Sequence, residues 1–141
     1  MQRLDGYRAA LAAARLPFNG RLVIAGDYMQ SGGYAAINAL LEARVEFTAV
    51  FAANEQTAYG AMLALYRRGL KVPQDVSMVG FDDLPSSAFT IPPLTTVHRS
   101  TDEIGEGAAE AIVDLVERRP PHARVSPPTL AIRDSTRPLR G

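Results

Sequence analysis

Residues 49–83 constrain the fold more than any other stretch, because two apolar runs of strand length flank one amphipathic run of helical length. The runs at 49–52 and 76–81 are short and continuous, which is typical of strands buried on both faces of a parallel sheet. Gly69 and Pro73 end the helical run between them. One face of that predicted helix carries apolar residues at helical spacing, namely Ala58, Ala61, Met62, Leu65 and Tyr66.

Polar residues follow both predicted strands. Asn54 comes just after the first strand, and Asp82 ends the second. Ligands of parallel α/β sheets bind outside the carboxyl ends of the strands. An amide donates and accepts hydrogen bonds and a carboxylate accepts them, so the pair suits a neutral polyhydroxylated ligand such as a sugar, or a purine-like base. Two plainer readings stay open: Asn54 caps the helix, and Asp82 and Asp83 form a polar turn.

The rest of the chain alternates in the same way between apolar runs of strand length and amphipathic runs of helical length. Strands that alternate with helices of this length indicate a mainly parallel α/β sheet flanked by helices. Further helices are predicted at residues 3–14, 32–41 and 101–119, and further strands at residues 22–25, 94–98 and 129–133.

Composition narrows the class of protein. The 141 residues fit one domain, and 47% of them are hydrophobic, which is enough for a packed core. The 15 basic and 15 acidic residues cancel, which argues against a nucleic-acid-binding surface on this chain. No cysteine is present for disulfides or thiolate metal sites. No apolar stretch is long enough to span a membrane, and the polar N-terminus does not resemble a secretory signal, so a cytoplasmic protein is expected.

Catalytic and metal-binding patterns are weak. His98 and His122 lie far apart and have no partners at ligand spacing, so no metal site is predicted. The chain contains no G-x-S-x-G elbow and no phosphate-binding glycine loop. Asp82 and Asp83 could imitate the acidic strand end of a receiver domain or a magnesium-dependent phosphatase, but Lys71 precedes that strand instead of following a later one. We therefore expect no enzymatic activity and no cofactor.

Three longer motifs resemble those of one family. VFAANEQTAYG, GLKVPQDVSMVGFDD and PPLTTV are similar to consecutive motifs in the effector-binding core of the LacI/GalR family of bacterial transcription regulators. RLDGY near the N-terminus and LAIRDSTR near the C-terminus extend the resemblance over nearly the whole chain.

The resemblance implies a domain organisation. Residues 1–141 would be the C-terminal part of an effector-binding domain, most of one lobe of a type I periplasmic-binding-protein-like fold. The helix-turn-helix headpiece, which alone would contact DNA, and the N-terminal subdomain would be absent. The effector, a sugar or related small metabolite, would sit between lobes that rotate on binding. A homodimer through this lobe and no membrane association are implied. The helix at 101–119 would cross to the other lobe, and we expect a second copy or a rearrangement to cover its apolar face.

The family's effector contacts map onto four residues here. Arg3 matches an arginine that holds ligand hydroxyls or a carboxyl, and Asn54 matches a polar amide contact. Asp82 matches the carboxylate that takes two ligand hydrogen bonds, whereas Asp83 would be structural. Tyr28 falls where an aromatic ring often stacks on the effector, although a half-buried loop tyrosine is an equal alternative.

Three functions are compatible with these observations. The first is an effector-sensing domain of a LacI-type transcriptional regulator, which controls DNA binding by a shift between lobe arrangements. The second is a free-standing sugar-binding protein for transport with the same fold. The third, a magnesium-dependent phosphatase or receiver-like domain, would bind a divalent metal at Asp82.

Overall fold

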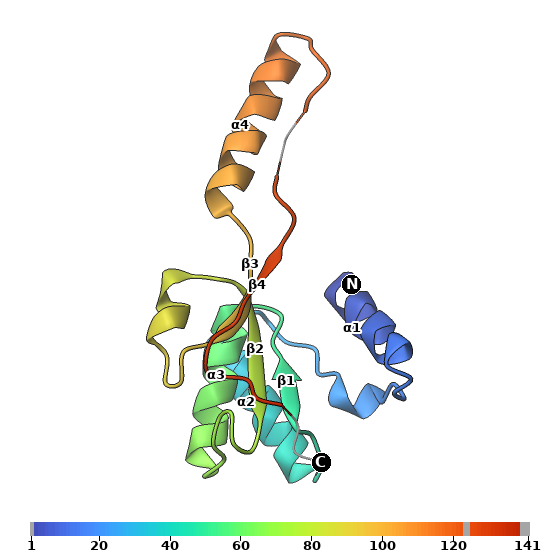
Figure 1. The fold of residues 1–141 in the computed structure, drawn as a ribbon, viewed down its shortest axis with the longest axis vertical. Helices are drawn as coiled ribbons and strands as arrows, with labels where there is room; N and C mark the ends of the chain where they lie inside the picture. Colours follow the sequence, from blue (N-terminus) through green and yellow to red (C-terminus); the bar gives the residue numbers. More distant parts are fainter. Residues whose placement is uncertain (1, 123–124, 139–141) are drawn as a thin grey trace.

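Four strands form one sheet in the computed structural model, which describes residues 2–122 and 125–138. The strands are β1 (Ala49–Phe51), β2 (Ser77–Asp82), β3 (Thr95–His98) and β4 (Thr129–Ala131), in the spatial order β1-β2-β3-β4. The first three are parallel and β4 is antiparallel to β3, which confirms the prediction of a mainly parallel sheet (Figure 1).

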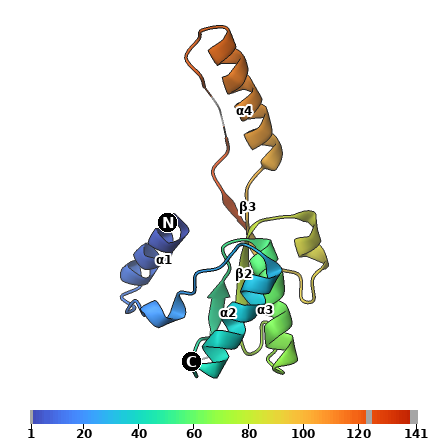
Figure 2. The same ribbon diagram turned by 180° about the vertical axis from the view of Figure 1, so that it is seen from behind.

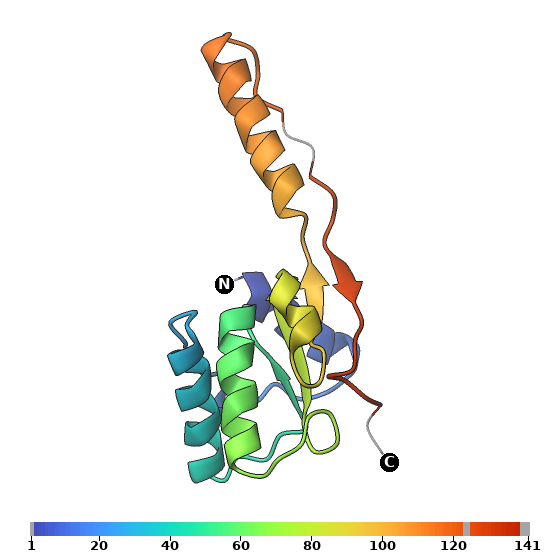
Figure 3. The same cartoon turned by 90° about the vertical axis from the view of Figure 1, so that its left-hand side faces the viewer.

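Two helices cover one face of this sheet. α2 (Gln30–Glu42) and α3 (Glu55–Arg67) lie side by side on the same face (Figure 3). In the apolar stripe predicted for α3, Ala58, Ala61 and Leu65 are buried against the sheet, whereas Tyr66 is 79% exposed. The small alanines let α3 lie close to the strands. The buried apolar core comprises Ile37, Leu40, Ala52, Ala58, Ala61, Ala64, Leu65, Val76, Met78 and Leu94.

The contact between α2 and α3 depends on two glycines. A Cβ atom at Gly33 would lie 2.0 Å from the carbonyl oxygen of Thr57, and a Cβ atom at Gly60 would lie 1.8 Å from that of Gln30. Both separations are far below van der Waals contact. The two helix backbones therefore approach each other at a point where no other residue fits, although glycine weakens each helix by itself.

The prediction of a strand at residues 22–25 is wrong. A short 3-10 helix, η1 (Gly20–Leu22), precedes an irregular extended segment, and the Ile24 side chain is 44% exposed. Cavities of about 260 and 370 Å³, both lined by Leu22, Ile24 and Val50, separate this segment from β1, so no ladder forms. The outer side of β1 consequently stays open. Phe51 is 44% exposed, so the prediction that this strand is buried on both faces is also wrong.

Two helices lie away from the core. α1 (Gln2–Ala13) stands beside the sheet, and α4 (Thr101–Val116) projects beyond the end of β3, from which the chain returns to β4 (Figures 1 and 2). Ser100 caps α4 by accepting a hydrogen bond from the Glu103 amide at 3.2 Å. The expectation of a rearrangement that covers the apolar face of α4 is wrong, since Ile112, Leu115 and Val116 are 62, 61 and 77% exposed.

Within the described part of the chain, none of the helices combines the length and the apolar character that crossing a membrane requires.

The close helix contact leads to a stability prediction. We expect Gly60→Ala to lower the free energy of unfolding by ~1–3 kcal/mol, because the new methyl group forces α2 and α3 apart. Gly105 in α4 is a matched control, since a Cβ there meets nothing within 4 Å. Gly105→Ala should be neutral or should stabilise by up to ~1 kcal/mol through helix propensity. Urea unfolding measures both, and equal effects of the two substitutions would contradict the packing argument.

Candidate functional site

The carboxyl ends of β1 and β2 meet at one edge of the sheet. The strands pair in parallel, with Phe51 opposite Val79, and the Ala52 amide donates to the Val79 carbonyl at 2.9 Å. Asn54 follows β1 and Asp82 ends β2, so both lie at this edge, which we call the carboxyl edge. The sequence argument from parallel strands therefore places these two residues at the same end of the sheet.

Asn54 joins α3 to the loop that precedes α2. Its Oδ1 accepts a hydrogen bond from the Thr57 amide at 2.9 Å, so Asn54 is the N-cap of α3. Its Nδ2 donates to the backbone carbonyl of Tyr28 at 2.9 Å. One further lone pair and one further N–H remain on the amide for another partner. The capping reading of Asn54 is thus correct for the structure, and the cap also holds Tyr28 at the carboxyl edge.

Tyr28 presents its ring to solvent. Its backbone has a φ of 64°, and its side chain is 56% exposed. The preceding residue, Asp27, accepts a hydrogen bond from the Met29 amide at 2.9 Å and so closes the turn around Tyr28. The ring is therefore free to lie against a flat or apolar ligand surface, as the stacking role requires.

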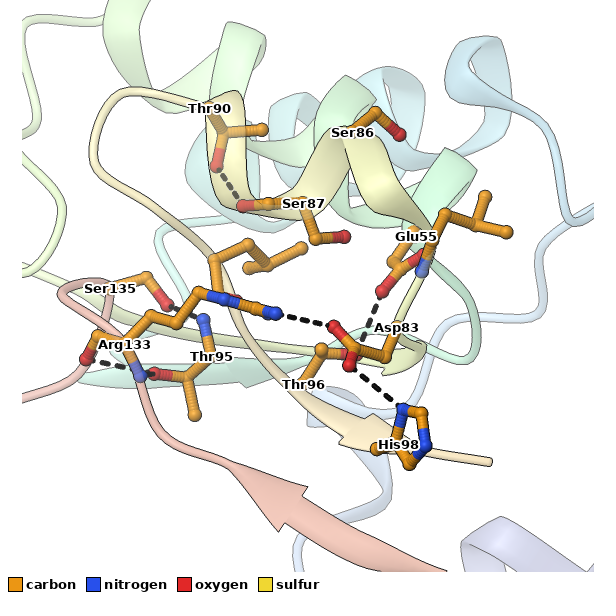
Figure 4. Close-up of polar contacts among 12 residues, drawn as sticks. Glu55, Asp83, Ser86, Ser87, Thr90, Thr95, Thr96, His98, Arg133 and Ser135 are labelled. Carbon is orange, nitrogen blue, oxygen red and sulfur yellow. Dashed lines mark hydrogen bonds and ion pairs between the residues drawn. The ribbon is translucent and has the colours of Figure 1, made fainter. Parts of the chain in front are cut away.

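The two consecutive aspartates have different surroundings. Asp82 accepts one hydrogen bond from Nη2 of Arg99 at 2.8 Å, and its side chain is 27% exposed. Asp83 is 14% exposed, and it lies 2.7 Å from Nη2 of Arg133 and 2.9 Å from Nδ1 of His98 (Figure 4). Asp82 is therefore the carboxylate with capacity for a ligand, whereas Asp83 ties β2 to β3 and to the C-terminal segment.

Arg3 reaches the same place from α1. Its guanidinium carbon lies 3.9 Å from the centroid of the Phe81 ring, and that of Arg99 lies 5.3 Å from it. Cations over an aromatic face are attracted by its quadrupole. The Nε atoms of both arginines are buried without a hydrogen-bond partner among the described residues. Sequence reasoning missed Phe81 and Arg99, although Phe81 directly precedes the aspartate pair.

A third residue missed as a contact is Glu55. Its side chain is 1% exposed, and both carboxyl oxygens accept hydrogen bonds from residues beyond its own helix (Figure 4). The one indication in the sequence is an acidic residue in the first turn of a helix, but that pattern predicts a solvent-exposed interaction with the helix dipole rather than a buried group.

The four predicted contacts are thus brought to one region, but not to one enclosed cavity. The cavity of about 260 Å³ is lined by Arg3, and the one of about 370 Å³ is lined by Tyr28. Asn54 and Asp82 are among the lining residues of neither. The carboxyl edge therefore carries a carboxylate, an amide, two guanidinium groups and a tyrosine, all of which are groups that form hydrogen bonds with hydroxyl groups.

The metal-dependent alternative lacks a suitable cluster in the part of the chain that the structure describes. No group of three or more His, Cys, Asp and Glu side chains that could hold a metal ion occurs there. Asp82 and Asp83 point to different arginines, so they do not form a shared carboxylate pair.

Known proteins with similar sequences and structures share one architecture. A family model described as periplasmic binding protein-like domain matches residues 1–136. The ribose operon repressor of Escherichia coli (strain K12) is 40% identical over 114 residues, which cover 81% of this chain and 34% of the repressor. The HTH-type transcriptional repressor PurR of Haemophilus influenzae (strain PittEE) is 36% identical over 117 residues, covering 83% of this chain and 35% of that protein. The chain thus spans about a third of the length of these curated relatives.

A solved structure extends the likeness to three dimensions. The LacI family transcriptional regulator from Enterococcus faecium with bound ribose superposes with a TM-score of 0.88 at 28% identity, covering 98% of this chain and 52% of that one. The chain therefore belongs to the family of periplasmic binding protein-like domains, in the form found as effector domains of LacI-family transcription regulators.

Proposed function

We propose that this chain is the C-terminal part of an effector-binding domain that binds a sugar at the carboxyl edge and so controls a LacI-family regulator. The observation that carries the proposal is the parallel pairing of β1 and β2, which brings Asn54 and Asp82 to one edge together with Arg3 and Tyr28. Support also comes from two relatives whose names refer to ribose, one by its operon and one by its bound ligand.

The role of each side chain follows from the hydrogen-bond donors and acceptors that its contacts within the protein leave unused. Asp82 accepts hydrogen bonds from ligand hydroxyls, since Arg99 occupies only one of its oxygens. Arg3 donates to ligand oxygens as a planar fork. Tyr28 lies against the sugar face, and Asn54 contributes its unused donor and acceptor while it holds Tyr28 in place. None of these roles needs a metal, a cofactor or a chemical step, so we propose a binding protein without enzymatic activity.

The exposed face of α4 supports the proposed domain organisation. In a whole regulator, an N-terminal subdomain outside this chain would cover Ile112, Leu115 and Val116, and the effector would bind between the two lobes. A DNA-binding headpiece, also outside this chain, would respond to the resulting shift in lobe arrangement. Two of the relatives are named as repressors, which favours a cytoplasmic regulator of this kind over a free-standing transport protein with the same fold.

A homodimer is the second part of the proposal. Hydrogen bonds of 2.8 and 3.0 Å between the Tyr59 hydroxyl and the hydroxyls of Ser86 and Ser87 join α3 to the 3-10 helix η2 (Pro85–Phe89). Next to this junction lie large exposed apolar side chains, which a second copy of the chain would cover. Their exposed fractions are 46% for Leu63, 79% for Tyr66, 85% for Phe89 and 95% for Ile91.

Effector binding can be tested by titration calorimetry of the full regulator with a panel of sugars, D-ribose first, and nucleosides. We expect one sugar to bind, and Asp82→Ala to weaken it by roughly 10- to 100-fold, because charged hydrogen bonds to the ligand are lost. Asp134→Ala removes an exposed carboxylate away from the carboxyl edge and should leave the affinity unchanged. Tight sugar binding that survives Asp82→Ala would refute the assignment of the site.

Dimerisation can be tested by sedimentation of the full regulator. We expect Ile91→Asp and Tyr66→Lys each to weaken self-association by at least about tenfold, because each places a charge in an apolar interface. Both side chains are largely exposed in the single chain, so neither substitution should unfold it. Leu16→Lys changes an exposed apolar residue after α1 and serves as the control. If all three variants associate like the unaltered protein, a different surface forms the dimer.

A further inference from the structure

Glu55 is a buried charged side chain directly behind the carboxyl edge. It is the first residue of α3, next to Asn54, and its side chain is 1% exposed. Removing a carboxyl group from water is costly unless its oxygens receive hydrogen bonds. The contacts that Glu55 makes must therefore offset the cost of its burial, and those contacts reach beyond α3.

The two oxygens of Glu55 connect two other elements. Oε2 accepts a hydrogen bond from the Leu84 amide at 2.6 Å, and Oε1 accepts one from the Thr96 hydroxyl at 2.9 Å (Figure 4). Leu84 follows the aspartate pair at the end of β2, and Thr96 lies within β3, with an exposed fraction of 0%. One carboxyl group at the start of α3 thus binds the turn after β2 and the neighbouring strand together.

Space for the Glu55 side chain comes from Gly80 in β2. A Cβ atom at position 80 would lie 3.2 Å from Cγ of Glu55, 3.3 Å from Oγ1 of Thr96 and 2.9 Å from Cδ2 of Leu94. A side chain at position 80 would crowd Glu55, Thr96 and Leu94, so these side chains would have to shift to admit it. The site that receives Glu55 is therefore built into the strand that carries the site aspartate.

The turn that Glu55 holds has an unfavourable backbone. Asp82 and Asp83 have φ angles of 103° and 60°, which residues with a side chain adopt only when the surroundings enforce them. Arg99 and Arg133 bind the two aspartate carboxylates and lie partly in solvent. The bond from Glu55 to the Leu84 amide is the contact that fixes the main chain of the turn from the buried side.

We propose that Glu55 is a positioning residue of the effector site, which aims the Asp82 carboxylate by fixing the backbone after β2. The consequence for ligand binding rests on the proposed function, whereas the ordering of the turn does not. Because Thr96 belongs to the strand that continues into α4, the same carboxyl group also ties the aspartate turn to the segment that leaves the sheet.

The ordering of the turn can be measured without a ligand. Glu55→Met keeps the side-chain length and removes both acceptors, so the Leu84 amide should exchange its hydrogen at least about tenfold faster. Glu55→Gln keeps an acceptor for that amide and should restore most of the protection. Ser135→Ala is the matched control, because Ser135 also bridges two strands, with 2.7 Å to the Thr95 amide and 2.6 Å to the Met78 carbonyl. It lies at the amino ends of β2 and β3, and its loss should leave Leu84 exchange unchanged.

Binding provides the second readout. In the full regulator, Glu55→Met should raise the Kd for D-ribose roughly tenfold. In a protein that already carries Asp82→Ala, Glu55→Met should raise the Kd by less than about twofold more, because both substitutions act through the Asp82 carboxylate. Glu55→Gln should restore the affinity, and Ser135→Ala should not change it even where it lowers the melting temperature. If Glu55→Met does not fold, Thr96→Val removes the hydrogen bond that holds Oε1, and the loosened glutamate should let the Leu84 amide exchange at least about twofold faster.

The outcomes separate the two proposals. Unchanged exchange at Leu84 in a folded Glu55→Met protein overturns the positioning role. Equal losses of affinity in Glu55→Met and Ser135→Ala also overturn it, because general destabilisation then accounts for both. If the unaltered regulator binds no sugar of the panel, the proposed function fails, and amide exchange alone decides whether Glu55 orders the turn.

Discussion

The parallel pairing of β1 with β2 through α3 is the constraint on which the rest of the structure depends. The crossover helix is held by Ala58, Ala61, Ala64 and Leu65, whose exposed fractions are 2% or less. A buried helix that connects two strands in this way fixes them parallel, and their carboxyl ends then share an edge. The close contact at Gly33 and Gly60 brings α2 against α3, and the two helices together cover this face of the sheet. Asn54 and Asp82 need no further topological condition to share this edge.

Much of this arrangement can be predicted from local patterns. Helical spacing along residues 58–66 and the apolar run at 76–81 indicate the strand-helix-strand unit, and the rule for parallel sheets then places Asn54 and Asp82 together. The distinction between the two aspartates agrees with their contacts, because Asp83 is the one held by Arg133 and His98. The strand-helix-strand unit and its shared edge depend on spacing within about 35 residues, which a single sequence displays directly. The distinction between the two aspartates, in contrast, is implied by the resemblance to the family.

What the sequence could not show depends on partners that are distant along the chain. The apolar run at 22–25 has the composition of a strand, but a strand also requires a ladder, and cavities separate this segment from β1. Glu55 looks like an ordinary first-turn acid until Leu84 and Thr96, 29 and 41 residues away, are placed beside it. The apolar face of α4 is visible in the pattern, whereas its exposure among the residues that the structure describes is not.

The backbone of the aspartate turn has a consequence for attempts to make this protein more robust. Glycine at position 82 or 83 would relieve a conformational cost on the order of 1 kcal/mol or more per residue, and so would be an obvious choice for improving heat tolerance. The same exchange at position 82 would remove the carboxylate that we propose as the acceptor for ligand hydroxyl groups. Heat stability and ligand recognition therefore favour different residues at position 82. A more stable variant has to gain its stability at other positions.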